Sequence, residues 1–314
     1  SAGRVQDIME CGVSTPVAMK SPEGNYVAIH EAALWEYPGM ALEFDAEELK
    51  FSTELAGDKE VKSSVELPFS TPWRTVIVGD RVGTLVESSM VLNLNEPCKL
   101  EDTSWIKPMK YVGVWWEMHL KVSIWDMDGK YPHCATTENV KKYIDFAAAN
   151  GLQQVLVEGW NIGWEDWFGH QKDYVFDFQT PYPDFDIKAL NEYAHSKGVR
   201  LMMHHETSSS VRNYERHMEQ AYSFMNKHGY TAVKSGYVGD IQPLGEHHFG
   251  QYMVNHYLYA VKEAAKHKIM VNAHEPDKRR KVKVSKLYEF EGLKKVEVEE
   301  AGIGSIVAIS GITD

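Results

Sequence analysis

Up to about Trp105, apolar residues occur in short stretches that turn residues separate. Three such stretches are residues 26–29, 75–78 and 90–94. Short apolar runs bounded by glycine, proline and asparagine predict β-strands rather than helices. We therefore expect residues 1–105 to form part of a β-sandwich.

A different pattern begins at Tyr111, where strand-length apolar runs alternate with amphipathic stretches of helix length. The predicted strands are 111–116, 154–157, 200–204, 232–237 and 269–273, and the predicted helices are 137–150, 186–196, 213–228 and 248–267. Strands joined through helices at this spacing run parallel. The sequence thus predicts an α/β fold, with an incomplete (β/α)8 TIM-type barrel of about five strands at 106–278. A short β-rich tail follows at 279–314.

Polar side chains lie near the end of each predicted strand. In chain order they are Glu117, Glu158, His204 with Glu206, Lys234, and His274 with Glu275. The carboxyl ends of parallel barrel strands open on one face, where active sites are built. Five such positions in phase therefore predict an active site.

The residue types at these strand ends indicate the kind of chemistry. Paired carboxylates can divide acid and base work, and glutamates that converge without cysteine suit a hard cation such as Ca²⁺. Tryptophans such as Trp116 and Trp160 lie in the same segments. Their flat faces suit sugar rings, and core packing explains them equally well.

The composition describes a folded and acidic chain. It has 314 residues, 43% of them apolar, and 33 basic against 45 acidic side chains give a net charge of −12. Such a charge disfavours binding to nucleic acid or to anionic membranes. No apolar run is long enough to span a membrane, and the first residues lack a signal-peptide pattern, so we expect a soluble chain. Three scattered cysteines predict neither a disulfide framework nor a zinc site.

Several motifs resemble glycoside hydrolase family 97, over about residues 1–276. They are HEAAL from His30, TPWR from Thr71, VGVWWEMH from Val112, VEGWNIGWE from Val157, HHETS from His204, VKSGYVG from Val233, MVNHY from Met253 and VNAHEP from Val271. The resemblance implies a β-super-sandwich followed by a (β/α)8 barrel. It also implies an enzyme that hydrolyses α-glucosides or α-galactosides.

The same resemblance implies roles for single residues. Glu206 is similar to the family's general base, and Glu275 is similar to a partner carboxylate that also binds calcium. Glu31 is similar to a glutamate that reaches the same ion from the sandwich. The positions that match sugar contacts, or that offer aromatic faces for them, are Glu158, His204, Lys234, His274, Trp116 and Trp160.

Gly236 decides between two branches of the family. The retaining branch places an aspartate nucleophile where this chain has Gly236. The chain is therefore expected to resemble the inverting, α-glucosidase-like branch. Inversion requires room for a water molecule, with the two carboxyls roughly 6.5–9.5 Å apart.

The resemblance ends after Pro276, before the family's general acid. Residues 281–314 resemble instead the second, β-barrel domain of the translational GTPase TypA (BipA). Glu299 and Glu300 lie near the chain distance of the missing acid, which we interpret as coincidence. Because a positioned general acid contributes typically 10²–10⁴ in rate, impaired hydrolysis is expected. Because members of the family are mostly exported, the resemblance implies a periplasmic or secreted location.

Two other classes of function stay open from the sequence. One is a non-catalytic remnant that binds α-glucosides or oligosaccharides without hydrolysing them. The other is a translation-associated module, which the absence of a G-x-x-x-x-G-K-[ST] motif and the acidic charge both disfavour.

Overall fold

The computed structural model describes residues 13–45, 47–167 and 172–274, together with the backbone of three strands in the tail. The chain divides into two compact units. The first comprises Ser1–Ala56, Val61–Glu96 and Asp277–Asp314, and the second comprises Gly57–Glu60 and Pro97–Pro276. The change of pattern predicted near Trp105 lies close to the division after Glu96.

The first unit contains two antiparallel sheets of three strands each. One sheet has the order β1 (Val13–Ser14), β4 (Met40–Asp45), β5 (Lys50–Leu55), and the other β2 (Val17–Lys20), β3 (Tyr26–Ala32), β6 (Trp73–Gly79). Buried Met40 and Leu42 of β4 pack against Val17 and Ile29 of the second sheet. This apolar layer between two sheets confirms the predicted β-sandwich part.

Residues 90–94 do not form the predicted strand. They lie in the short helix α3 (Met90–Asn93), which follows α2 (Gly83–Glu87). The amide of Leu94 donates to the carbonyl of Met90 at 3.1 Å, a helical hydrogen bond. A short apolar run without strict alternation fits a helix turn as well as a strand, which explains the error.

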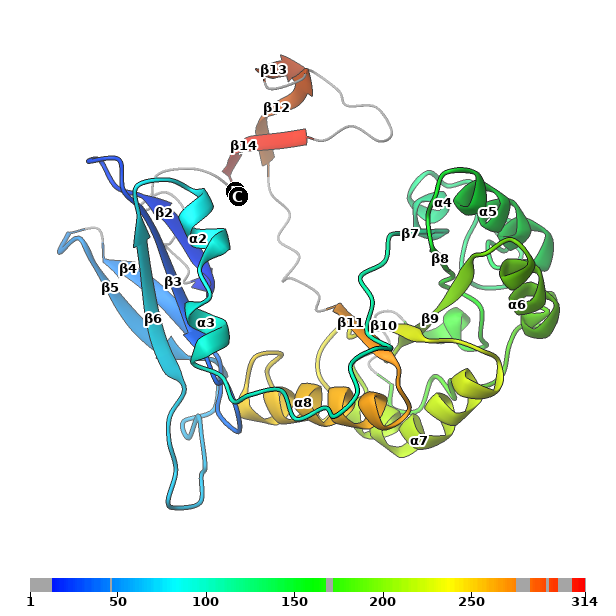
Figure 1. Ribbon diagram of the computed structural model, residues 1–314, viewed down its shortest axis with the longest axis horizontal. Coiled ribbons are helices and arrows are strands. Elements are labelled where there is room, and N and C mark those ends of the chain that lie inside the picture. Colours follow the sequence, from blue (N-terminus) through cyan, green and yellow to red (C-terminus); the bar gives the residue numbers. More distant parts are fainter. Residues whose placement is uncertain are drawn as a thin grey trace. The chain divides into compact units, whose positions relative to one another are not determined.

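The second unit is built on a curved sheet of five parallel strands. In spatial order they are β11 (Met270–His274), β10 (Ala232–Gly236), β9 (Arg200–Glu206), β8 (Gln154–Leu156) and β7 (Tyr111–Gly113). The connecting helices lie along the outer side of this sheet, as Figure 1 shows: α5 (Thr137–Ala149), α6 (Ile187–Ser196), α7 (Val211–Lys227) and α8 (Gln251–Lys266). The predicted incomplete TIM-type barrel is confirmed.

The first predicted barrel strand is shorter than expected. β7 ends at Gly113, and the residues that follow form the short helix α4 (Trp115–His119). Glu117 therefore lies on a helix and not at a strand end. Its carboxylate accepts hydrogen bonds from Ser123 at 2.5 Å, from Asn139 at 2.9 Å and from Tyr143 at 2.8 Å. These contacts tie α4 to α5, so Glu117 has a structural role.

Side chains on the barrel strands alternate between two faces. Leu201 and Met203 of β9 join the large core under the helices, and the intervening Met202 packs with Leu156 and Ala232 on the inner face. Because the alternation has a period of two, the polar residues beyond this inner row also face inward. The sheet therefore presents Glu158, His204, Glu206 and Lys234 on one face, toward its carboxyl end.

The tail contains the three strands β12 (Lys283–Glu291), β13 (Lys294–Val298) and β14 (Val307–Thr313). They form an antiparallel sheet in the order β13-β12-β14, so the β-rich character of the tail is confirmed. Its resemblance to a translation factor stays a prediction. Within the described part of the chain, no helix is both long and apolar enough to cross a membrane.

Candidate active site

Strand register brings the predicted sugar-contacting residues to one level. Lys234 of β10 lies opposite His204 of β9, and Gly236 lies opposite Glu206 on one side and His274 on the other. Glu158 follows β8 by two residues, and its strand ends beside Met202. The predicted strand-end residues of four βα units thus meet at the carboxyl edge of the sheet.

Glu158 is a buried carboxyl with an incomplete set of partners. Its side chain is fully shielded from solvent, and neither oxygen has a hydrogen-bond partner among the described residues. Lys234 forms an ion pair with it, with Nζ 3.7 Å from Oε1. Burial raises the pKa of Glu158 to about 7, although the Lys234 charge opposes the shift. The carboxyl is therefore poised between its protonated and ionised forms near neutral pH.

His204 is a second buried polar group that lacks a partner. Its ring stacks on Trp164 at a centroid distance of 5.7 Å, and Nδ1 has no hydrogen-bond partner within the described ranges. Burial, together with the charges of Lys234, His205 and His274, lowers the pKa of His204 well below its usual value. A neutral imidazole can donate from one nitrogen and accept at the other, which suits a sugar hydroxyl. Unpartnered buried polar atoms in a native fold call for an explanation, and a ligand supplies one.

Glu206 is held by the backbone of two loops. Its Oε1 accepts from the amide of Ser208 at 2.8 Å and from the amide of Val238 at 3.2 Å. Burial raises the pKa of Glu206 to about 7, and these amides oppose the shift. Its carboxylate is thus positioned without a basic side chain bonded to it, so it keeps the affinity for protons that a general base needs.

The turn after Glu206 has a strained backbone. Ser208 and Ser209 both adopt left-handed conformations, with φ of 51° and 57°. Non-glycine residues rarely adopt this region, which costs of order 1 kcal/mol or more and is found most often at functional sites. These two residues lie next to the carboxylate, and the amide of Ser208 donates to it.

Gly236 lies directly against Glu206. A Cβ atom at position 236 would stand 2.4 Å from Oε2 of Glu206. This is far inside van der Waals contact, so the two positions cannot both carry a side chain in this geometry. The close approach explains a glycine at the end of β10.

The two tryptophans predicted to face the sugar are placed differently from each other. Trp116 is 68% exposed on α4, whereas Trp160 is 1% exposed in the core. Trp160 donates from Nε1 to the carbonyl of His204 at 2.8 Å and stacks on Phe224. The expectation that Trp160 offers a face to the sugar is not supported by this placement, because its ring joins β8 to β9 and the helix layer. Trp115 lies near the polar group, with Lys234 Nζ 5.6 Å from its ring centroid.

Of the two predicted calcium ligands, Glu31 and Glu275, only Glu31 lies among the described residues. Glu31 belongs to the first unit, where Oε2 accepts from Thr15 at 2.9 Å and from the Met40 amide at 2.8 Å. Its Oε1 pairs with Arg74. Glu275 lies outside the described residues, and among those described no group of three or more His, Cys, Asp or Glu side chains is arranged to hold a metal. Calcium binding stays a prediction, and we derive no step from it.

TIM-type barrels build their active sites at the carboxyl ends of the strands, and glycoside hydrolases use paired carboxyls for catalysis. Residues 115–283 match the family described as Glycoside hydrolase 97, and residues 2–97 match its N-terminal domain, Glycosyl-hydrolase 97 N-terminal. The chain belongs to glycoside hydrolase family 97.

Solved structures and curated relatives agree with this assignment. A family 97 enzyme from Pseudoalteromonas sp. strain K8, solved with acarbose, is 46% identical, with a TM-score of 0.76 over 85% of this chain and 41% of that one. A retaining alpha-galactosidase from Bacteroides thetaiotaomicron is 26% identical over 64% of this chain and 32% of its own length. A probable retaining alpha-galactosidase from Streptomyces bingchenggensis is 28% identical over 51% of this chain and 22% of its own. The chain thus spans less than half of each of these relatives.

Proposed function

We propose that this chain carries the base-side half of an inverting glycoside hydrolase that cleaves α-glucosidic bonds. The observation that carries the proposal is the contact between Gly236 and Glu206. Because a Cβ at position 236 would meet Glu206 Oε2 at 2.4 Å, a nucleophile at this position would require the Glu206 carboxylate to move from its present place. The resemblance implies that the retaining branch of the family carries an aspartate at this position.

In the proposed reaction Glu206 accepts a proton from the attacking water. Two backbone amides orient its Oε1, and burial keeps its pKa near neutrality, which suits a general base. The Glu158–Lys234 pair and the neutral His204 bind hydroxyl groups of the sugar in the first subsite. Glu275 is proposed as the partner carboxylate, and export to the periplasm or medium is proposed from the family.

The names of the relatives support two different substrates, an α-glucoside and an α-galactoside. The solved Pseudoalteromonas enzyme, at 46% identity, was crystallised with acarbose and, as a variant, with panose. The curated relatives at 26% and 28% identity are named as retaining or probable retaining alpha-galactosidases. The higher identity supports an α-glucoside as substrate, and a retaining α-galactosidase is the second candidate.

The purified chain should be tested with matched aryl α-glucoside and aryl α-galactoside substrates. Proton NMR of the first sugar released separates the two candidates, since inversion yields the β-anomer of glucose and retention the α-anomer of galactose. Glu206→Gln should abolish the glucosidase activity, and Glu192→Gln, at an exposed position of α6, serves as the matched control. An α-anomer as first product, or full activity in Glu206→Gln, would contradict the proposal. Calorimetric binding of the glucoside without any product would select the non-catalytic remnant.

A further inference from the structure

The segment that carries Glu158 has left the sheet. The β8 ladder with its neighbours ends at Leu156, so Glu158, Gly159 and Trp160 lie beyond it. Three donors bond the carbonyls of these residues. His133 Nε2 lies 2.8 Å from the Gly159 carbonyl, the Tyr182 amide donates to the Trp160 carbonyl at 2.9 Å, and Cys134 Sγ lies 3.6 Å from the Glu158 carbonyl.

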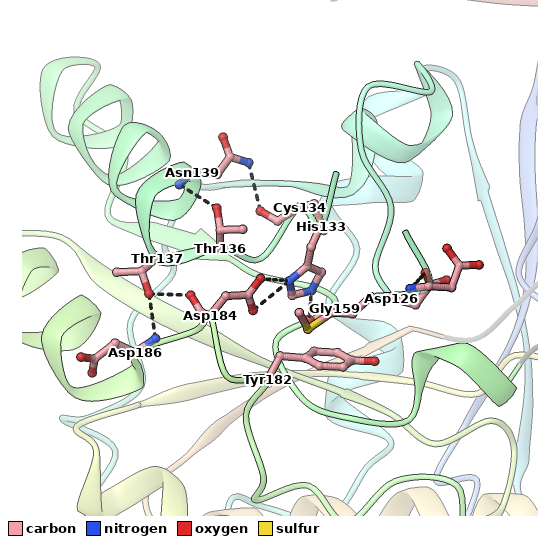
Figure 2. Close-up of polar contacts among 12 residues, drawn as sticks. Asp126, His133, Cys134, Thr136, Thr137, Asn139, Gly159, Tyr182, Asp184 and Asp186 are labelled. Atoms are coloured by element: carbon pink, nitrogen blue, oxygen red, sulfur yellow. Dashed lines mark hydrogen bonds and ion pairs between the residues drawn. The ribbon is translucent and has the colours of Figure 1, made fainter. Parts of the chain in front are cut away.

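His133 is the strongest of these donors. Its Nε2 must carry a proton, because a carbonyl oxygen can only accept. Its Nδ1 lies 2.9 Å and 3.1 Å from the two carboxylate oxygens of Asp184. Figure 2 shows the ring held between this carboxylate and the Gly159 carbonyl. The His133 side chain is only 5% exposed, whereas that of Asp184 is 30% exposed, so the imidazole is the shielded member of the pair.

Asp184 is itself fixed between the starts of two helices. Its carbonyl accepts from the amide and from the hydroxyl of Thr137, both at 2.8 Å. The same hydroxyl accepts from the amide of Asp186, whose side chain caps α6, and Thr136 caps α5 (Figure 2). The backbone of Asp184 is therefore fixed beside the first turns of α5 and α6. Its carboxylate holds the His133 ring in a defined position relative to these helix ends.

The backbone at Gly159 is also closely packed against Trp125. Gly159 adopts a left-handed conformation with φ of 78°, and a Cβ there would stand 2.8 Å from the Trp125 carbonyl oxygen. The backbone at Gly159 is thus packed against Trp125 and bonded to His133. Because Glu158 is the preceding residue, these two contacts restrain the backbone next to it.

We propose that His133 and Asp184 form a positioning pair that holds the Glu158 carboxyl in its water-free place beside Lys234. The pair acts through the Gly159 carbonyl, so His133 is a positioning residue and not a catalytic one. The importance of this pair for hydrolysis rests on the proposed function, whereas its effect on the position of the Glu158 carboxyl does not.

The test follows the titration of Glu158 by carbon-13 NMR of glutamate carboxyls, with no substrate present. Peaks are assigned from Glu158→Gln and Glu206→Gln. Both glutamates are expected to titrate near pH 7 in the wild type, since burial raises the pKa of each to about 7. His133→Phe keeps a ring beside Tyr182 and removes both hydrogen bonds. It should lower the Glu158 midpoint by at least one pH unit toward 4.5, because the freed carboxyl reaches water.

Three comparisons separate positioning from general loosening. Glu206 should keep its midpoint in His133→Phe. His133→Gln should restore the midpoint of Glu158, because glutamine retains one N–H donor. His195→Phe, at an exposed position of α6, should change neither midpoint. An unchanged Glu158 midpoint in His133→Phe, equal shifts of both glutamates, or no recovery in His133→Gln would overturn the proposal. If His133→Phe does not fold, Asp184→Asn takes its place, with the same expected selective shift. A lack of hydrolysis would count against the proposed function alone.

Discussion

At the scale of single residues, two glutamates reach a similar pKa by burial but are held in different ways. Glu206 accepts two backbone amides, whereas Glu158 faces a lysine at 3.7 Å and is otherwise unpartnered among the described residues. An amide-held carboxylate keeps a fixed direction, which suits a base that must point at water. A carboxyl with free acceptor positions suits the binding of hydroxyl groups.

The raised pKa of Glu206 predicts a pH-dependent stability. The folded state binds the proton up to about pH 7 and the unfolded state only up to 4.5, so this group lowers stability as pH rises through that window. Glu206→Gln removes the penalty. We expect it to stabilise the chain at pH 8, relative to its effect at pH 5, by up to about 3 kcal/mol. Urea denaturation at both pH values measures this, with Glu192→Gln as control; equal effects at the two pH values would refute it.

Gly236 supports a second prediction at this scale. Gly236→Ala places a methyl group 2.4 Å from the present position of Glu206 Oε2, so the carboxylate must move. If Glu206 is the base, hydrolysis of an aryl α-glucoside should fall about 10²-fold or more, in the range of lost general-base catalysis. Thermal melting monitors the fold in parallel. Wild-type activity in Gly236→Ala would show that the carboxylate position at Glu206 is unimportant.

At the scale of elements, α4 replaces the end of the first predicted strand. The run Tyr111 to Trp116 is apolar throughout, and periodicity alone does not separate strand from helix in so short a run. In the helical turn, Glu117 receives hydrogen bonds from Ser123, Asn139 and Tyr143, and these tertiary contacts stabilise α4.

This arrangement predicts that Glu117 stabilises the fold without taking part in chemistry. Glu117→Ala leaves Asn139 and Tyr143 without their carboxylate acceptor, and hydrogen bonds to charged groups contribute about 1.5–3 kcal/mol each. We expect the free energy of unfolding to fall by about 2–4 kcal/mol. The rate per folded molecule, measured below the melting transition, should change less than threefold. A loss of rate without a loss of stability would place Glu117 in the active site.

At the scale of the whole molecule, the acidic net charge disfavours the translation-associated function that the resemblance of the tail suggests. The net charge is −12 and no P-loop motif occurs in the sequence. Non-specific binding to nucleic acid depends on basic side chains that displace counterions from phosphates. We therefore expect no cosedimentation with ribosomes even at about 50 mM salt. Salt-sensitive cosedimentation would revive the translation-associated alternative.

The sequence predicts the fold more completely than it predicts the arrangement of the site. The parallel order of five strands follows from alternating strand and helix patterns, and the placement of Glu158, His204 and Lys234 at one level follows from their position at strand ends. Trp160 is an example of what the sequence does not predict. A tryptophan at a polar strand end has the same sequence pattern whether its ring faces a sugar or the core. His133 and Asp184 gave no signal, since 51 residues separate them and their contact depends on two loops.

The sequence by itself determined the family, the partial barrel and the row of polar strand ends, because these depend on local periodicity and on motifs within a few residues. The tertiary structure alone decided which side chains are buried without partners, that Glu31 pairs with Arg74, and that Gly236 lies against Glu206. Each of those depends on contacts between segments distant in the chain. Burial and close approach are properties of three-dimensional packing, and no single segment encodes them.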